Sequence, residues 1–185
     1  MSTRRILILV TGPSGVGKTT LARALSRELR LPAFHKDDLK ETLFDVLPDR
    51  SPEERAQFGI ASFVLLEGIA RAVLPYGSAI VEANFHGGIA SEGWRALIAE
   101  TEVEAFVIEL TAPLEVLTER IIGRIEAGLR HPGHTARAPE ADAATLPSLQ
   151  IGAPKLLLDG TLAPAELLAL TLAWLERGTE TPLTT

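Results

Sequence analysis

The sequence predicts an α/β fold, a three-layer sandwich in which a five-stranded parallel sheet lies between two layers of helices. Short apolar segments alternate along the chain with longer segments whose apolar residues recur at helical spacing. Because a helical segment stands between each strand and the next, we expect parallel strands with helices on both faces of the sheet. We expect the order second-third-first-fourth-fifth strand, one domain over residues 1–178, and a flexible tail at 179–185.

The first strand, a glycine loop and the first helix open the chain. Residues 4–10 hold a short, continuous apolar run rich in β-branched residues, which is typical of a buried parallel strand. A loop follows from Gly12 to Gly17. Residues 18–30 are expected to be helical because one face would carry apolar side chains, namely Leu21, Ala24, Leu25 and Leu29.

The second strand and two further helices come next. We expect a strand at 32–35 and then a helix to Leu47, which Asp37 or Asp38 can cap. A longer helix should span 51–74, because Ser, Pro and Glu occupy its N-cap, first and capping-box positions.

The rest of the chain repeats the alternation. We expect strands at 78–83, 104–110 and 155–158. We expect helices at 92–100, 113–129 and 164–177. Prolines open the last two of these helices. Residues 130–147 are rich in Pro, Ala, Gly and charge, which predicts a loop.

The composition narrows the class of protein. The 185 residues are 46% apolar and 23% charged, which argues against a disordered, collagen-like or coiled-coil chain. With no cysteine, the chain has no disulfide scaffold, thiolate nucleophile, iron–sulfur cluster or cysteine–zinc site. No apolar run reaches the roughly 18 residues that a membrane span needs. We therefore expect a cytoplasmic protein that does not enter a membrane.

Charge is unevenly distributed along the chain. Residues 1–40 carry eight Lys or Arg and three Asp or Glu, whereas residues 41–119 carry four and fourteen. The net charge of −6 and the pI near 5.3 disfavour a protein that tracks a long nucleic acid, although a local basic pocket remains compatible with them.

A glycine-rich loop between the first strand and the first helix matches G-x-x-x-x-G-K-[ST]. Its residues are Gly12, Pro13, Ser14, Gly15, Val16, Gly17, Lys18 and Thr19. Glycines let successive backbone N–H groups turn toward phosphate oxygens, and the following helix adds its N-terminal dipole. Lys18 can reach the β- and γ-phosphates, Thr19 can ligate Mg²⁺, and Thr20 can touch the α-phosphate. The motif predicts a nucleoside triphosphate site.

With this loop, an Asp-Asp pair after the second strand and an arginine-rich segment, the chain resembles the small P-loop kinases. That group holds adenylate-kinase-like folds, gluconate and shikimate kinases, chloramphenicol phosphotransferase, zeta toxins and polynucleotide 5′-kinases. The resemblance covers nearly the whole chain. It implies a P-loop NTPase fold, transfer of phosphate from ATP with Mg²⁺, and an arginine-rich lid at about residues 128–139.

The segment from His35 to Lys40 resembles the one that holds the general base in the antibiotic kinase, zeta toxin and polynucleotide kinase branch. That resemblance makes Asp37 the group that accepts the proton of the attacking hydroxyl. Asp38 and Lys40 are expected to bind the acceptor, Lys40 where the polynucleotide branch holds an acceptor phosphate. The alternatives are that the aspartates only cap the next helix and that Lys40 is a surface lysine.

Two polar residues end the third strand. Relatives usually carry Asp at the position of Glu82, where it holds the Mg²⁺ shell or the acceptor. A carboxylate at the carboxyl end of a parallel strand points into the crevice where ligands bind. We expect Glu82 to serve the metal or the acceptor and Asn84 the acceptor. The alternatives are a loop acid and a turn-forming asparagine.

Arginines follow the fourth strand. By the resemblance, Arg120 faces the adenine, Arg124 is the catalytic arginine, and Arg130 is a lid residue that contacts nucleotide. The alternative for each is a solvated helix-face arginine. His131 and His134 do not indicate zinc, because neither a Cys nor a further His lies nearby, and we expect them to form hydrogen bonds within the lid.

Three functions remain open at this point. The leading one is an ATP-dependent kinase that phosphorylates a hydroxyl of a small molecule such as an antibiotic, sugar, nucleoside or other metabolite. A polynucleotide 5′-hydroxyl kinase is favoured by Lys40 and opposed by the acidic balance, and a salt-sensitive activity on oligonucleotides would distinguish it. The third is a non-catalytic nucleotide-binding module that regulates a partner.

Overall fold

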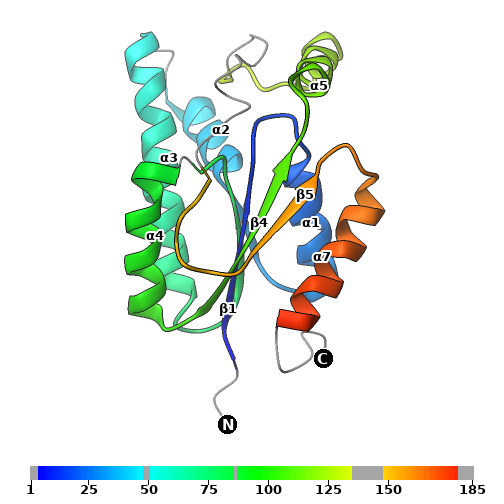
Figure 1. Ribbon diagram of the computed structural model, residues 1–185. Coiled ribbons are helices and arrows are strands. Elements are labelled where there is room, and N and C mark those ends of the chain that lie inside the picture. The colour runs from blue at the N-terminus through cyan, green and yellow to red at the C-terminus, as the bar shows by residue number, and fades with distance from the viewer. Residues whose placement is uncertain (1–3, 48–50, 86, 135–147, 179–185) are drawn as a thin grey trace.

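A parallel sheet forms the centre of the protein (Figure 1). The structure is a computed structural model that describes residues 4–47, 51–85, 87–134 and 148–178. The strands within these residues are β1 (Ile6–Thr11), β2 (Ala33–His35), β3 (Ala79–Glu82), β4 (Glu104–Thr111) and β5 (Lys155–Asp159). They pair in the order β2-β3-β1-β4-β5, and every pairing is parallel. The predicted fold class and strand order are confirmed.

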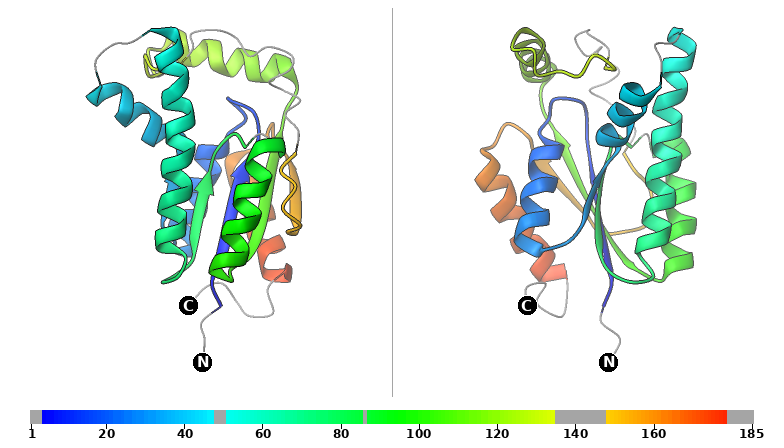
Figure 2. Two further views of the ribbon diagram at one scale, coloured as in Figure 1. Left: turned by 90° about the vertical axis from the view of Figure 1, so that its left-hand side faces the viewer. Right: turned by 180° about the vertical axis from the view of Figure 1, so that it is seen from behind.

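Helices cover both faces of the sheet and its carboxyl edge. They are α1 (Lys18–Leu29), α2 (Lys36–Val46), α3 (Pro52–Val73), α4 (Gly87–Thr101), α5 (Leu114–Glu126) and α7 (Pro164–Gly178). Helices α1 and α7 lie on one face, and α3 and α4 lie on the other (Figures 1 and 2). Helix α5 crosses above the carboxyl edge, so the residues that follow the strands face the space beneath it.

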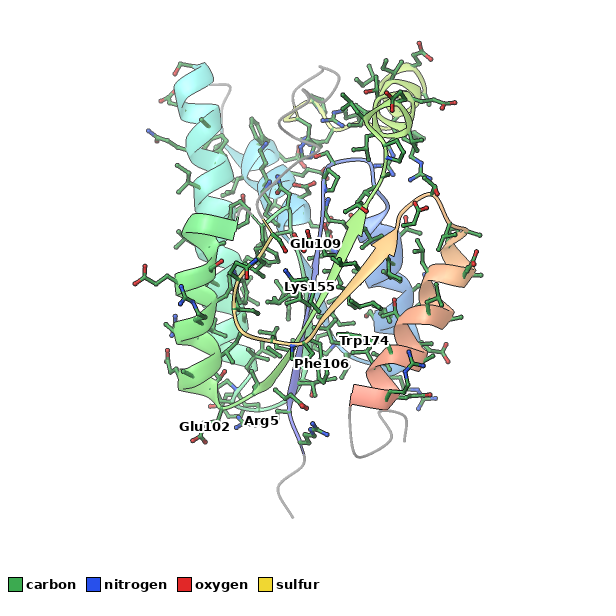
Figure 3. All side chains as sticks on the ribbon, viewed as in Figure 1. Arg5, Glu102, Phe106, Glu109, Lys155 and Trp174 are labelled. Atoms are coloured by element: carbon green, nitrogen blue, oxygen red, sulfur yellow. The ribbon has the colours of Figure 1, made fainter. Side chains whose placement is uncertain are left out.

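The central strand β1 explains why both faces are covered. Successive side chains of a strand point to opposite faces. In β1, Ile6, Ile8 and Val10 pack in the core on the side of α1 and α7. Leu7 and Leu9 pack in the core on the side of α3 and α4. On the first side, the Phe106 ring meets Trp174 of α7 edge to face, with centroids 5.6 Å apart (Figure 3).

Three helix ends differ from the sequence predictions. Helix α2 begins at Lys36 after the N-cap His35, so Asp37 and Asp38 lie in its first turn instead of capping it. Carboxylates are favourable there because they face the positive end of the helix dipole. Helix α4 begins before the predicted Glu92, at Gly87, and helix α5 ends before residue 129, at Glu126.

The long helix α3 begins as predicted and has an apolar composition. The Ser51 side chain accepts a bond from the Glu54 N–H, and the Glu54 carboxylate accepts one from the Ser51 N–H. By length and composition alone, Ala56–Val73 is a candidate membrane span, with a mean hydropathy of 1.4. This finding corrects the expectation that no segment is long and apolar enough to span a membrane. Two of its residues, Leu66 and Ala70, are fully buried against the sheet.

Candidate active site

The phosphate loop joins β1 to α1 with an unusual backbone. Gly12, Gly15 and Gly17 have φ values of 137°, 83° and 108°, a region that side chains disfavour. A Cβ at Gly12 would also overlap the carbonyl oxygen of Leu110. Lys18, at the start of α1, donates to the Pro13 carbonyl at 3.0 Å. The loop therefore needs glycine at these positions to keep the curled form that a phosphate cradle requires.

Glu82 lies beneath this loop and is 3% exposed. Its Oε2 accepts a bond from Thr19 Oγ1 at 3.0 Å and lies 3.1 Å from His35 Nδ1. Its Oε1 lies 3.9 Å from Lys18 Nζ. Burial lowers the pKa of Lys18, and the Glu82 charge opposes that shift. The carboxylate thus holds together the end of β3, the start of α1 and the end of β2.

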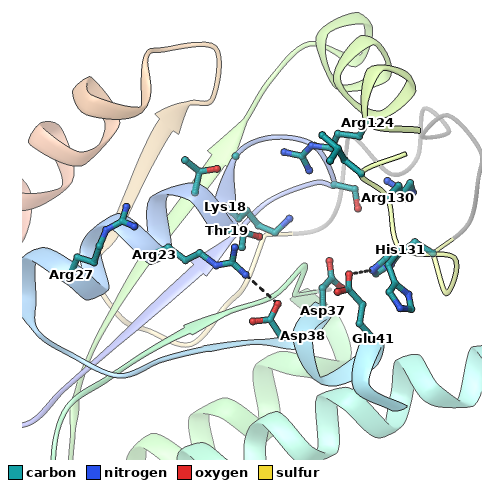
Figure 4. A pocket seen from close by; sticks show the side chains of 16 residues that line it. Lys18, Thr19, Arg23, Arg27, Asp37, Asp38, Glu41, Arg124, Arg130 and His131 are labelled. Carbon is teal, nitrogen blue, oxygen red and sulfur yellow. Dashed lines mark hydrogen bonds and ion pairs between the residues drawn. The ribbon is translucent and has the colours of Figure 1, made fainter. Parts of the chain in front are cut away.

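A cavity of about 490 Å³ opens beside the loop at the carboxyl edge of the sheet (Figure 4). It brings together loop residues with side chains from α1, α2, α5 and the segment after α5. It is lined by Ser14, Gly15, Gly17, Lys18, Thr19, Thr20, Arg23, Arg27, Asp37, Asp38, Glu41, Arg124, Leu129, Arg130, His131 and His134. Asp37, Arg124 and Arg130, which are separate in sequence, therefore face the same space as Lys18.

The Asp37 carboxylate is surrounded by positive charge. Lys36 Nζ donates to Asp37 Oδ1 at 3.1 Å. Burial alone would raise the pKa of Asp37, but Lys36, His134 and Lys18 together hold that pKa below its usual range. The carboxylate therefore stays ionised and able to accept a proton.

A second, smaller cavity of about 150 Å³ adjoins the first and shares Gly15, Gly17, Thr20 and Arg124 with it. Apolar side chains line much of it, including Val16, Leu21, Leu162 and Leu167. Arg120 and Arg124 also line it. The Arg120 guanidinium donates to the Gly160 carbonyl at 2.8 Å and to the Val16 carbonyl at 3.4 Å. The apolar walls of this cavity suit a flat base. The two hydrogen bonds fix the Arg120 guanidinium at the edge of the cavity, between Val16 and Gly160.

The segment after α5 contacts α2 instead of bonding only within itself. His134 Nε2 lies 2.8 Å from Glu41 Oε1, and His131 Nε2 lies 3.0 Å from Asp45 Oδ1. The expected bonds within the lid are present, since His131 Nδ1 accepts from the Gly133 N–H and the His134 N–H donates to the His131 carbonyl, but both rings also contact α2, which was not expected. Burial lowers the pKa of His134, although Glu41 opposes that shift.

Part of the predicted lid lies outside the described residues. Of the predicted lid at residues 128–139, the structure describes 128–134. Residues 135–147, which complete the predicted loop, lie outside the described residues, as does the predicted tail at 179–185. In the described part, Arg130 Nε is buried without a hydrogen-bond partner. An unpaired guanidinium nitrogen beside the main cavity is the kind of donor that an incoming phosphate can satisfy.

Three predicted acceptor residues line neither described cavity. Glu82 lies below the loop, Asn84 bonds to Lys36 at 3.5 Å, and Lys40 lies over the Phe44 ring at 5.6 Å. The sequence analysis missed other residues that do line the main cavity, namely Arg23, Arg27 and Glu41. The spacing of Arg23 and Arg27, one helical turn apart and one turn beyond Thr19, was the signal that could have found them.

Oxygen atoms at the base of the loop fit a magnesium ion. Within the described ranges, no group of three or more His, Cys, Asp and Glu could hold a metal by itself. Mg²⁺ is usually bound by one or two protein oxygens together with waters and substrate phosphates. The Thr19 hydroxyl and the Glu82 carboxylate, 3.0 Å apart, match that donor set.

Comparison with known proteins identifies the family. The AAA_33 family, described as an AAA domain, matches residues 7–147. The chain belongs to this family. A crystal structure from Chloroflexus aurantiacus j-10-fl, named a "putative kinase", is 33% identical, with a TM-score of 0.85 over 96% of this chain and 100% of that one. The predicted resemblance to small P-loop kinases is confirmed.

Other relatives share the fold or part of the sequence. A gluconokinase from Sinorhizobium meliloti 1021 is 19% identical, with a TM-score of 0.62 over 96% of each chain. The Mycobacterium tuberculosis APS kinase, in complex with AMPPNP and APS, is 19% identical with a TM-score of 0.65 over 94% of this chain and 98% of that one. A shikimate kinase of Pseudomonas fluorescens (strain Pf0-1) is 34% identical in a 110-residue alignment that covers 54% of this chain and 60% of the relative. The chain thus matches less than two thirds of that curated relative.

Proposed function

We propose that this protein is an ATP-dependent kinase that transfers the γ-phosphate to a hydroxyl of a small molecule in the cytoplasm. One observation carries the proposal: the Lys18 ammonium and the Asp37 carboxylate face the same cavity from opposite elements. Lys18 belongs to the phosphate loop, and Asp37 belongs to α2. A phosphate held at the loop would therefore have a charged proton acceptor across the cavity from it.

The residues divide the chemistry among them. The backbone N–H groups of the loop and Lys18 bind the β- and γ-phosphates, and Thr20 contacts the α-phosphate. Thr19 and Glu82 would hold Mg²⁺, which when bound neutralises charge on the phosphates. The base of ATP occupies the smaller cavity beside Arg120, and Arg124, which lines both cavities, spans from the nucleotide to the transferring group.

Transfer requires one proton movement and one exchange of P–O bonds. The acceptor oxygen forms a bond to the γ-phosphorus as the bond to the β–γ bridging oxygen breaks, and ADP leaves. The hydroxyl proton passes to the Asp37 carboxylate. Arg124 and Arg130 stabilise the charge that spreads over the γ-phosphate oxygens. Asp38, on the wall of the cavity, contacts the acceptor.

The acceptor class is tested with labelled ATP. Transfer of ³²P from [γ-³²P]ATP is measured with pooled hydroxyl metabolites, antibiotics and short oligonucleotides as acceptors. We expect transfer to a small molecule in the presence of Mg²⁺. Lys40, the residue that favoured a polynucleotide acceptor, lies over the Phe44 ring and lines neither cavity. If only oligonucleotides were phosphorylated, and in a salt-sensitive way, the assignment of a small-molecule acceptor would be wrong.

A pair of matched variants tests the base. Asp37→Asn keeps the shape of the side chain but cannot accept the proton, so kcat should fall by about 10²-fold, the lower end for loss of a general base. ATP affinity, measured by calorimetry, should barely change because the loop and Lys18 make the main phosphate contacts. Asp38→Asn is the control and should affect the KM of the acceptor more than kcat. Loss of kcat in Asp38→Asn but not in Asp37→Asn would show that the wrong carboxylate is assigned.

A further inference from the structure

Lys36 is a buried lysine directly beside the assigned base. It is the first residue of α2 and is 8% exposed. Burying an ammonium group is costly unless other groups compensate for the lost water. A lysine in a charged segment such as His35–Lys40 is ordinarily exposed, so a buried Lys36 needs partners that compensate for its lost hydration.

Three parts of the fold supply those partners. Lys36 Nζ donates to Asp37 Oδ1 at 3.1 Å and lies 3.5 Å from Asn84 Oδ1, just after β3. It also lies over the Phe63 ring of α3, 5.3 Å from the centroid. A cation above an aromatic face is attracted by the ring quadrupole, more strongly when it is desolvated. The ammonium is therefore fixed between α2, α3 and the end of β3.

We propose that Lys36 is a positioning residue, which holds the Asp37 carboxylate in place and leaves Oδ2 to take the proton of the acceptor. The proposal rests on the proposed kinase function. Without Lys36, Asp37 would keep its place on α2, but its side chain would be free to rotate. Asn84 and Phe63 act one step further away, because they fix the ammonium that fixes the base.

The charges around Asp37 support this role. Lys36 makes the largest of the contributions that lower the pKa of Asp37 against the effect of burial, and it is the one that also donates a hydrogen bond. His134 from the lid and Lys18 from the loop act in the same direction. Arg130 and Lys40 also interact with the Asp37 charge. Removing Lys36 should therefore raise the pKa of Asp37, although the other neighbouring groups would still lower that pKa.

The test compares Lys36→Met, which keeps the length of the side chain, with Lys36→Arg, which keeps the charge. The first measurement is the titration of the Asp37 carboxyl carbon by NMR in the protein without nucleotide. We expect the midpoint to move to higher pH in Lys36→Met and to stay near the wild-type value in Lys36→Arg. The same measurement on Lys155→Met is the control, since Lys155 pairs with Glu109 away from both cavities. This control should leave the Asp37 midpoint unchanged.

The second measurement is the pH profile of kcat/KM with the acceptor that the ³²P-transfer screen identifies. Because Asp37 must be ionised, activity falls as pH drops through its pKa, and the acid limb should move to higher pH in Lys36→Met. At the pH optimum, kcat should fall about tenfold to a hundredfold from loss of orientation, with ATP affinity unchanged. In Lys36→Arg, the acid limb and kcat should both stay close to their wild-type values. A lysine that only stabilised the fold would not make both quantities depend on the charge.

The outcomes separate this proposal from the function on which it rests. An unchanged Asp37 midpoint in folded Lys36→Met overturns the role of Lys36, whatever the activity. A shifted midpoint in a protein that transfers phosphate to no acceptor supports the Lys36–Asp37 coupling and contradicts the kinase function. If Lys36→Met does not fold, Phe63→Leu removes the ring without touching either charge. It should move the Asp37 midpoint in the same direction by a smaller amount, and no movement would contradict the proposal.

Discussion

Replacing Glu82 with Gln should destabilise the empty protein, because it leaves the buried Lys18 ammonium without its nearest negative charge. The Glu82 side chain is 4% exposed and the Lys18 side chain 9%, so water screens their interaction poorly. Gln keeps the size of the side chain and can still accept the bond from Thr19 Oγ1. What it removes is the negative charge 3.9 Å from a buried ammonium.

The structure sets the size of the effect. Removing one partner of a buried ion pair usually costs about 3–5 kcal/mol, because the other charge is left uncompensated. Here the distance is near the outer limit of an ion pair, and Asp37 also stabilises the Lys18 charge. We therefore expect a loss of about 2–3 kcal/mol in the free energy of unfolding. For a domain of this length, that corresponds to a fall in Tm of roughly 4–12 °C.

Urea unfolding without nucleotide or Mg²⁺ measures this loss. The midpoint should fall while the slope m stays constant, since the surface exposed on unfolding does not change. Glu109→Gln is the matched control, because Glu109 pairs with Lys155 at 3.3 Å on neighbouring strands (Figure 3). Those side chains are 14% and 23% exposed, so the control should lose less than half as much.

Two results would refute the reasoning about Glu82. Equal losses in Glu82→Gln and Glu109→Gln would mean that burial of the Lys18 pair adds nothing. A gain in stability for Glu82→Gln would mean that the free-energy cost of burying the carboxylate is larger than the stabilisation from its interactions with neighbouring groups.

Three further predictions concern the nucleotide. Lys18→Ala should abolish phosphate transfer by removing charge stabilisation of the transferring group, and near-normal turnover would contradict the phosphate site. Gly12→Ala should lower ATP affinity at least tenfold in calorimetry, because its Cβ would overlap the Leu110 carbonyl and force the loop to shift. Amide hydrogen exchange over residues 128–134 should slow when a non-hydrolysable ATP analogue binds, and full protection in the empty protein would argue against a lid.

The sequence was sufficient for the sheet because local patterns determine it. The continuous apolar run of β1 indicates a strand that is buried on both faces, and the helical spacing in α1 indicates a helix that is buried on one face. Both patterns can be read without knowledge of distant residues. The start of α4 was missed because Gly87 and Gly88 disfavour a helix locally, so only tertiary packing can extend the helix back to them. The fold class was therefore predictable where that helix boundary was not.

The site was less predictable because its contacts join distant parts of the chain. The loop motif gives Lys18 and Thr19 directly, since their roles follow from spacing within eight residues. The bond from His134 to Glu41 spans 93 residues, and the burial of Lys36 depends on Phe63 and Asn84. No local pattern marks a lysine as buried, so the one beside the base resembled any solvated lysine.

The two adjacent aspartates show how the fold separates groups that the sequence leaves equivalent. Consecutive residues of a helix point about 100° apart, so Asp37 and Asp38 have different partners although both line the main cavity. Asp37 meets the buried Lys36 and the charge of Lys18. Asp38 Oδ1 instead lies 3.4 Å from Arg23 of α1, and both of those side chains are more than half exposed. A base needs a fixed, ionised carboxylate close to the phosphate, which describes Asp37. The Asp37 side chain is 49% exposed, so its partner distinguishes it from Asp38: Asp37 is held by a buried lysine, whereas Asp38 pairs with an exposed arginine that it can exchange for a polar acceptor.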